Sequence, residues 1–352
     1  MSKPVNPGDK AVTATIILTN YNHAKYLDCS LSGIVNQSRP ADEIIVIDDG
    51  STDNSLEIIE DYARRYPQIH VLKNGQNKGV QYSIARAMGA VTSDWLAWAA
   101  ADDKLLPDFL ARNIAMIEKY PETGLVFSEL ATFHDETGEE TYYSHPDIPG
   151  SAFHIGHEHR YYTPKGMMKR LEDSYLWLSG NTVLVRKTDL LDVGAFIPQL
   201  EWHSDWYAFY AVALRHGAVG IPEALAMMRV VPETYSSAGM KDKKRQRMVM
   251  TALLDILRRP ENVDIRRKIR ARPCIVSPFR HEILSTLLRT PRDFSLLIRL
   301  LSWKFEHRVV EARSRLAGVK FPRGLRTRIF FGFYRVARKS LNMVTRKKWR
   351  TG

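Results

Sequence analysis

Two adjacent carboxylates, Asp102 and Asp103, follow an uncharged run at residues 95–101. A short run of this kind predicts a buried strand, and open α/β sheets bind ligands at the carboxyl ends of their strands. Adjacent anions repel each other, and a hard divalent cation carried by the phosphates of a substrate would compensate them. The simpler alternative is that one of the two aspartates caps a helix that starts near residue 105.

Polar clusters also follow other apolar runs near the start of the chain. Residues 19–22 follow a predicted strand at 14–18, and residues 48–53 follow another at 43–47. Carboxyl ends of parallel strands share one edge of a sheet, so these clusters would meet near Asp102. The side chains expected around this single site are Thr19, Tyr21, Asp49, Arg86 and Asp102. A plain turn is the alternative for residues 48–51.

The elements that would position these residues alternate regularly. Apolar runs at 14–18, 43–47, 69–72 and 95–101 predict strands. Helical spacing of apolar residues lies between them, at 26–35, 56–66 and 82–89. This alternation predicts an α/β fold with a mostly parallel sheet wrapped by helices.

Charge divides the 352-residue chain into two unequal parts. Residues 241–352 hold 31 Lys and Arg against 8 Asp and Glu, a balance of +23, so residues 1–240 carry −11 of the formal +12. We therefore expect a domain at 1–240 and a basic, mainly helical region at 241–352. Two cysteines imply no disulfide framework and favour a reducing compartment. No apolar run approaches the roughly 18 residues of a membrane-spanning helix.

The basic region predicts amphipathic helices. Apolar residues recur at helical spacing within 294–309 and again within 329–344, with Arg and Lys largely off these stripes. Basic amphipathic helices suit an anionic membrane surface. The alternative is a helical subdomain packed on the rest of the protein, with solvated charges. No nucleic-acid-binding motif is present, so nucleic acid is not an expected partner.

Residues 12–240 resemble family 2 glycosyltransferases with the GT-A fold, a Rossmann-like αβα sandwich. The resemblance depends on residues 19–22, 45–53, 77–79, 85–86 and 101–103, all in the family's order and spacing. It implies a nucleotide-diphosphate-sugar donor, transfer with inversion, and Mg²⁺ or Mn²⁺ as cofactor. The processive-synthase signature Gln-x-x-Arg-Trp is absent, which favours addition of a single sugar per encounter.

The resemblance also implies roles for individual residues on the donor side. Tyr21 would flank the nucleotide's base, Asp49 would accept a hydrogen bond from it, and Asp102 would hold the metal. The donor-binding positions are Thr19, Asn20, Tyr21, Asp49, Arg86, Ala101 and Asp103. The family often has a first Asp where this chain has Ala100, and many members have a His where it has Val231.

On the acceptor side, Asp205 matches the family's general base, which takes the proton of the attacking hydroxyl. The alternative is that Asp205 only caps the helix at 206–214. Gly180, Asn181 and Trp202 are the expected acceptor or sugar contacts, and Ser204 stands where the family has a further acid. Four histidines between residues 144 and 160 could suit a transition metal, but prolines and a glycine there favour a loop.

Together these observations predict an inverting glycosyltransferase that moves one sugar to a saccharide or lipid-linked saccharide acceptor in surface polysaccharide or glycan assembly. We expect it to be cytoplasmic and peripheral on the cytoplasmic face of a membrane. A nucleotidyltransferase, which would release pyrophosphate, is one alternative. A nucleotide-binding scaffold with a decayed site is the other, because of Ala100 and Val231.

Overall fold

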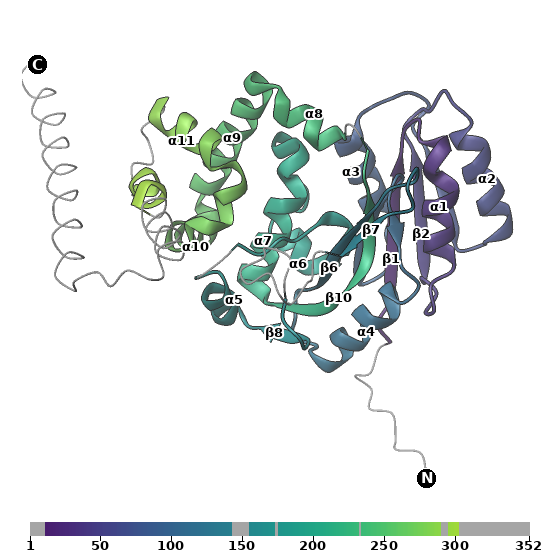
Figure 1. Ribbon diagram of the computed structural model, residues 1–352, viewed down its shortest axis with the longest axis horizontal. Helices are drawn as coiled ribbons and strands as arrows, with labels where there is room; N and C mark the ends of the chain where they lie inside the picture. Colours follow the sequence, from purple (N-terminus) through teal and green to yellow (C-terminus); the bar gives the residue numbers. More distant parts are fainter. Residues whose placement is uncertain (1–10, 143–154, 173–174, 232–233, 290–294, 303–352) are drawn as a thin grey trace, which may run out of the picture. The chain divides into compact units, whose positions relative to one another are not determined.

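The computed structural model of the protein describes residues 11–142, 155–172, 175–231, 234–289 and 295–302 (Figure 1). One ten-stranded sheet forms its centre, in the order β3-β2-β1-β4-β9-β6-β10-β5, with β7 beside β6 and β8 beside β10. The strands are β1 (Ala14–Asn20), β2 (Glu43–Asp48), β3 (Ile69–Lys73), β4 (Trp95–Ala100), β5 (Lys104–Leu105), β6 (Leu125–Phe133), β7 (Glu140–Tyr142), β8 (Arg160–Tyr162), β9 (Val183–Arg186) and β10 (Ala218–Arg229).

The N-terminal half of the sheet is parallel, as the sequence predicts. Strand β1 pairs in parallel with both β2 and β4, and β3 pairs in parallel with β2. Beyond β4 the sheet is mixed, because β9 runs antiparallel between β4 and β6. The four predicted strands and the three helices between them are all present, with ends shifted by one or two residues.

Helices cover both faces of the sheet and make the expected αβα sandwich. Helices α1 (Ala24–Val35), α2 (Ser55–Arg65) and α4 (Phe109–Lys119) bury their apolar sides in one core with alternate residues of β1, β2 and β4. The opposite face contacts α3 (Val80–Ala90), α6 (Lys187–Asp192) and α7 (Ser204–His216). Helix α5 (Pro164–Arg170) and the 3-10 turn η1 (Gly180–Thr182) complete this part of the chain.

The described residues after 240 are helical, as the sequence predicts. They form α8 (Tyr235–Lys241), α9 (Lys243–Arg258), α10 (Val263–Ala271) and α11 (Arg280–Arg289), with turns η3 (Pro260–Asn262) and η4 (Pro273–Phe279). In Figure 1 these helices gather beside α7, and α9 packs on the turn η2 (Pro198–His203).

The chain divides into two compact units, residues 1–300 and residues 301–352. The domain boundary expected after residue 240 stays a prediction. Most of the two amphipathic stripes, within 294–309 and 329–344, lies outside the described residues.

Candidate functional site

The strand ends that the sequence predicts to meet do meet. In the sheet register, Thr19 of β1 pairs with Ile47 of β2 and with Ala100 of β4, so the three strands end side by side. A pocket of about 410 Å³ opens at this edge. The predicted residues that line it are Thr19, Ala101, Asp102, Asp103, Gly180, Asn181, Trp202 and Asp205.

The two adjacent aspartates have different surroundings. Asp103 is partly exposed, and its two carboxylate oxygens accept hydrogen bonds from the Arg229 backbone N–H at 2.9 Å and from the Asn181 side chain at 3.0 Å. Burial, and then the negative charge of Asp102, raise the pKa of Asp103 to about 7. The Asp102 carboxylate lines the pocket and makes no hydrogen bond or ion pair with other described residues. Asp102 is therefore the carboxylate available to a cation.

The helix-cap alternative for this pair does not hold. Asp102 and Asp103 lie in a turn that leads into strand β5, and α4 begins only at Phe109, after Asp108. The turn is fixed from the side by Arg229, a residue that sequence reasoning missed. Its Nε donates to the Asp102 carbonyl at 2.7 Å, and its guanidinium also pairs with Asp135.

Arg229 is itself held rigidly. It is 5% exposed, and its guanidinium lies over the rings of Tyr26 and Phe133, at 4.6 and 4.5 Å from their centroids. Such contacts stabilise a desolvated cation. The placement of a positive charge beside Asp102 and Asp103 offsets part of their repulsion. The sequence gives little indication of this role, because the only feature that marks Arg229 is its place at the end of a strand, β10.

Asp205 lies in the first turn of α7, whose N-cap residue is His203. It is therefore inside the helix and is not the cap that the alternative required. Its carboxylate accepts a hydrogen bond at 2.7 Å from the next backbone N–H, that of Trp206. Burial raises the pKa of Asp205 to about 6, which is within the range of a general base that works near neutral pH.

Gly180 approaches this carboxylate closely. A Cβ added to Gly180 would lie 3.1 Å from Asp205 Oδ2. With Asp205 as the predicted general base, we expect Gly180→Ala to displace its carboxylate and to lower kcat about ten-fold or more, since small misplacements of reacting groups cost much of the rate. Gly89→Ala in α3 is the matched control, because a Cβ there meets nothing within 4 Å. Steady-state kinetics of both variants would test this, and equal rates would contradict it.

The segment before Asp205 is strained. Glu201 has φ 45° and ψ −117°, an unusual backbone conformation for a residue other than glycine. Gln81 of α3 holds it from one side, donating to the Glu201 carbonyl at 2.8 Å and to Ser204 Oγ at 3.0 Å. Strain of this kind persists where surrounding contacts enforce it, and it clusters at functional sites.

Other predicted donor residues lie beside the pocket without lining it. Asp49 accepts hydrogen bonds from the Asn74 side chain at 2.6 Å and from the backbone N–H groups of Lys78 and Gly79 at 2.9 and 2.8 Å. Arg86 donates to the Lys73 carbonyl and to the Asn74 side chain, so the same loop after β3 is held from two sides.

Asn20 and Tyr21 complete this neighbourhood. The Asn20 side chain donates to Asp48 at 2.9 Å and to Ser51 at 3.1 Å, which ties the ends of β1 and β2 together. Tyr21 is 40% exposed, as an aromatic surface for a planar base would be. The roles of Asn20, Tyr21, Asp49 and Arg86 in nucleotide binding stay predictions.

The residues of the pocket fit a divalent cation that arrives with a substrate. No group of three or more His, Cys, Asp or Glu side chains within the described ranges could hold a metal by itself. Mg²⁺ is commonly bound through one or two carboxylates together with substrate phosphates. Asp102, with an uncommitted carboxylate in the pocket, matches that mode.

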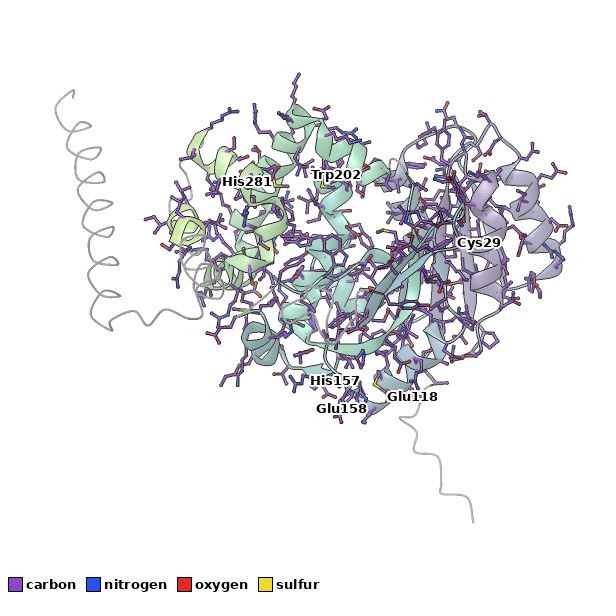
Figure 2. All side chains as sticks on the ribbon, viewed as in Figure 1. Cys29, Glu118, His157, Glu158, Trp202 and His281 are labelled. Atoms are coloured by element: carbon purple, nitrogen blue, oxygen red, sulfur yellow. The ribbon has the colours of Figure 1, made fainter. Side chains whose placement is uncertain are left out.

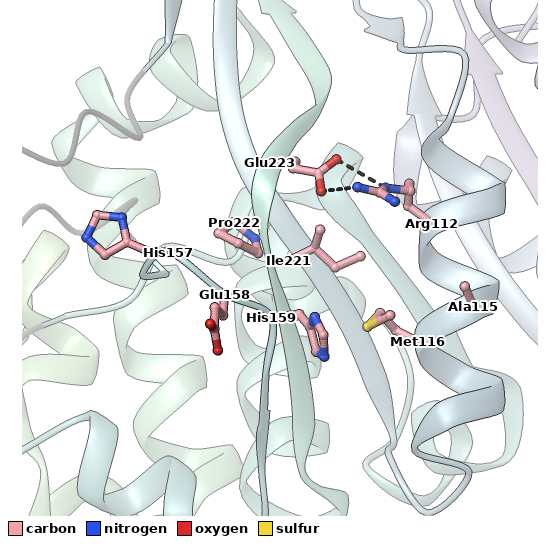
Figure 3. Close-up of a pocket in the computed structure, with 9 residues that line it drawn as sticks. All are labelled: Arg112, Ala115, Met116, His157, Glu158, His159, Ile221, Pro222 and Glu223. Atoms are coloured by element: carbon pink, nitrogen blue, oxygen red, sulfur yellow. Dashed lines mark hydrogen bonds and ion pairs between the residues drawn. The ribbon is translucent and has the colours of Figure 1, made fainter.

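A second hollow, of about 490 Å³, shares no lining residue with this pocket. It lies between α4, β10 and residues 157–159, and Figure 3 shows two of its lining residues, Arg112 of α4 and Glu223 of β10, joined in an ion pair. His157 and His159 line it, whereas His145 and His154 lie outside the described residues. The transition-metal alternative for these histidines therefore has no support among the described side chains.

The sheet, its flanking helices and the acidic pocket at the strand ends are those of a GT-A glycosyltransferase. The chain belongs to glycosyltransferase family 2. The sequence profile of Glycosyl transferase family 2 matches residues 15–186. A putative glycosyltransferase of Bacillus subtilis, EpsE, is 30% identical over 191 residues, which are 49% of this chain and 67% of that protein.

Other relatives match shorter stretches or only the fold. The putative teichuronic acid biosynthesis glycosyltransferase TuaG of Bacillus subtilis is 28% identical over 28% of this chain and 40% of its own length. The structure of S. aureus TarS 1–349 aligns with a TM-score of 0.55 at 18% identity, over 76% of this chain and 72% of that one. The mannosyltransferase PcManGT of Pyrobaculum calidifontis, solved with GDP-Man and Mn2+, gives 0.52 at 16% identity, over 95% and 84%.

These comparisons show that the protein is a glycosyltransferase with the GT-A fold, and one of its relatives is named for teichuronic acid biosynthesis. Among the helices that the structure describes, none has the length and apolar character needed to cross a bilayer.

Proposed function

We propose that the protein transfers one sugar from a nucleoside-diphosphate sugar to a saccharide acceptor, with inversion at the anomeric carbon. The observation that carries this proposal is that one pocket is lined both by an uncommitted carboxylate, Asp102, and by a carboxylate of raised pKa, Asp205. A group that holds a cation and a group that takes a proton are the two requirements of a single displacement.

In the proposed reaction the acceptor oxygen attacks the anomeric carbon, and the bond from that carbon to the diphosphate oxygen breaks. Asp205 takes the proton of the acceptor hydroxyl, and the nucleoside diphosphate leaves with the bonding electron pair. A bound Mg²⁺ or Mn²⁺ would supply a Lewis acid for the charge on the leaving diphosphate, held by Asp102. Gly180 leaves space beside Asp205, and Trp202 gives an apolar surface for the acceptor sugar.

Thermal stability against a panel of nucleoside diphosphates, with and without Mn²⁺, tests the donor site. A ligand that binds only the folded state, present at a concentration of 100 times its Kd, stabilises that state by about 2.7 kcal/mol. We expect one diphosphate to raise the melting temperature, and Mn²⁺ to increase that rise. Absence of any rise would favour a decayed scaffold. Release of pyrophosphate in place of a nucleoside diphosphate would favour a nucleotidyltransferase.

We also propose that the protein binds the cytoplasmic face of an anionic membrane, where a lipid-linked acceptor would lie. Residues 240–248, which we call the basic ridge, are exposed at most positions and begin four residues after the pocket residue Ser236. Met240 and Met248 project apolar side chains from a surface rich in Lys and Arg. Such a mixture matches an anionic lipid surface.

Reversal of ridge charges tests the membrane proposal. Each Lys or Arg near an anionic surface contributes about 1 kcal/mol, so Lys243→Glu with Arg247→Glu would greatly reduce sedimentation of the full chain with phosphatidylglycerol vesicles. Lys165→Glu with Lys169→Glu is the matched control, since these exposed lysines have the same spacing on α5. Equal losses in both variants would show that net charge, and not the ridge, determines binding.

A further inference from the structure

The wall of the pocket that contains Asp205 is supported by a helix that lies about forty residues further along the chain. Within residues 201–205, the side chains of Glu201, Trp202, Ser204 and Asp205 line this wall, and α9 packs on η2, which ends at His203. Figure 2 labels Trp202 where the ribbons of η2, α8 and α9 come together. The wall has the strained backbone of Glu201 at its start, so its shape depends on what surrounds it.

Gln246 of α9 makes the most specific of these contacts. Its side-chain oxygen accepts a hydrogen bond from Trp202 Nε1 at 2.8 Å, and its amide nitrogen lies 3.1 Å from His203 Nε2. The indole N–H can only donate, so the amide oxygen faces Trp202 and the amide N–H₂ donates to the imidazole. His203 therefore carries its proton on Nδ1.

All three side chains are buried, and Gln246 is only 3% exposed. Burial lowers the pKa of His203 to about 4, which agrees with a neutral imidazole that accepts at Nε2. A buried donor or acceptor that loses its partner is costly to leave unsatisfied. The side chain of Gln246 thus supplies hydrogen-bond partners for two consecutive buried side chains, those of Trp202 and His203.

Neighbouring contacts from the same region hold the wall further. Arg245 Nε lies 2.7 Å from Glu201 Oε2, and its guanidinium lies 5.3 Å from the centre of the Trp202 ring. On α8, a Cβ added to Gly239 would lie 2.3 Å from the Trp202 ring, so glycine is required for this approach. Glu201, Trp202 and His203 are consequently each held by α9, while Gln81 of α3 holds the wall from the other side.

We propose that Gln246 is a positioning residue for sugar transfer: by holding Trp202 and His203, it sets the acceptor surface and the placement of Asp205, and α9 is therefore part of the catalytic unit. This inference rests on the proposed function, in which Trp202 contacts the acceptor sugar and Asp205 is the base. It extends the catalytic unit beyond the residues matched by the family profile, which end at 186.

Gln246→Leu tests this proposal in the full chain. We expect kcat for transfer to fall about ten-fold or more and the KM for acceptor to rise, because the wall shifts. The thermal shift produced by a nucleoside diphosphate with Mn²⁺ should stay unchanged, because the donor side is not touched. Leu257→Ala is the control: it removes buried volume from α9 eleven residues away, roughly 16 Å along the helix.

Comparison of the two variants separates a positioning role of Gln246 from a general loss of stability. If Gln246→Leu and Leu257→Ala lower the melting temperature equally and reduce kcat equally at 25 °C, Gln246 acts only through stability and the proposal is wrong. Trp202→Phe in the Gln246→Leu background gives a second readout. Since the unsatisfied indole N–H is then gone, the double variant should recover part of the lost kcat, and additive losses would overturn the proposal.

The outcome also separates this inference from the function on which it rests. Wild-type protein that turns over no donor with any acceptor would defeat the proposed function. Active wild-type protein with an equally active Gln246→Leu variant would leave that function intact and defeat only the role of Gln246.

Discussion

Asp205→Asn is expected to slow sugar transfer by orders of magnitude and to leave nucleoside diphosphate binding intact. Asparagine keeps the size of the side chain but cannot take the proton of the attacking hydroxyl. General-base catalysis contributes about 10² to 10⁴ in rate, so kcat should fall by that factor. The measurement is transfer kinetics beside a thermal shift with the diphosphate and Mn²⁺. Full transfer by this variant would remove Asp205 from the base role.

The same substitution has a predicted effect on stability, and its sign follows from the pKa. The pKa of Asp205 rises from 3.8 to about 6 in the folded protein, so the ionised carboxylate opposes folding. The protonated carboxyl, by contrast, favours the folded state. Its contribution to stability is fully present below pH 3.8 and is lost as the pH rises through about 6. Asp205→Asn should therefore have an equal or higher melting temperature at pH 7.5, together with lost activity.

The pH profile provides a further check on Asp205. With the base protonated below its pKa of about 6, kcat/KM of the wild type should fall about ten-fold per pH unit on the acidic side. Glu57→Gln is a suitable control, since Glu57 is also an acid in the first turn of a helix but is exposed on α2. It should retain the wild-type profile, and an acidic limb that persists in Asp205→Asn would assign the limb to another group.

The parallel half of the fold could be predicted because its signals are local. Apolar runs such as 44–47 mark the strands, and the helices between them show clear apolar spacing, so alternation alone predicts the parallel sheet. The mixed half could not be predicted in the same way. Strand β9 has four residues and joins β4 to β6 antiparallel, a long-range pairing that no local pattern encodes.

The candidate site was predictable where residue type alone marks it. Asp102 stands out at the end of an apolar run, Asp205 was indicated by the family resemblance, and the structure places both at one pocket. Their division of labour with Asp103 was not predictable, because it depends on Arg229 and Asn181, which approach from distant parts of the chain. Gln246 lies outside the matched motifs altogether. Its contacts with Trp202 and His203 exist only once α9 has packed on η2.

The ends of β2 and β3 show a further limit of sequence reasoning. The family resemblance assigns Asp49 to the base of the donor, yet here both of its oxygens accept hydrogen bonds from the chain itself. A motif gives the residue type at a strand end, whereas the partner of that residue depends on a loop from elsewhere in the fold. Asp49 would contact a base in addition to, or in exchange for, its bonds with residues 74–79.

Asp102→Asn should remove the effect of Mn²⁺ on donor binding, and Asp103→Asn should not. The Asp102 carboxylate has no hydrogen bond or ion pair among the described residues, so its charge is available to a cation. Both oxygens of Asp103 already accept hydrogen bonds, from Arg229 and Asn181, and these bonds hold the turn. A divalent metal binds a neutral amide oxygen more weakly than a carboxylate, which explains the expected loss.

The two variants are matched in size and chemistry and differ by one position, so they act as controls for each other. In Asp102→Asn, the melting temperature without ligand should stay near the wild-type value, and Mn²⁺ should add nothing to the shift caused by the diphosphate. In Asp103→Asn, the Mn²⁺ increment should persist, because Asp102 keeps its carboxylate. The reverse pattern would make Asp103 the metal ligand. If both variants keep the Mn²⁺ increment of the thermal shift, the metal is bound by the donor's phosphates alone. A site that needs no protein carboxylate would agree with Ala100, which stands where the family often has an Asp.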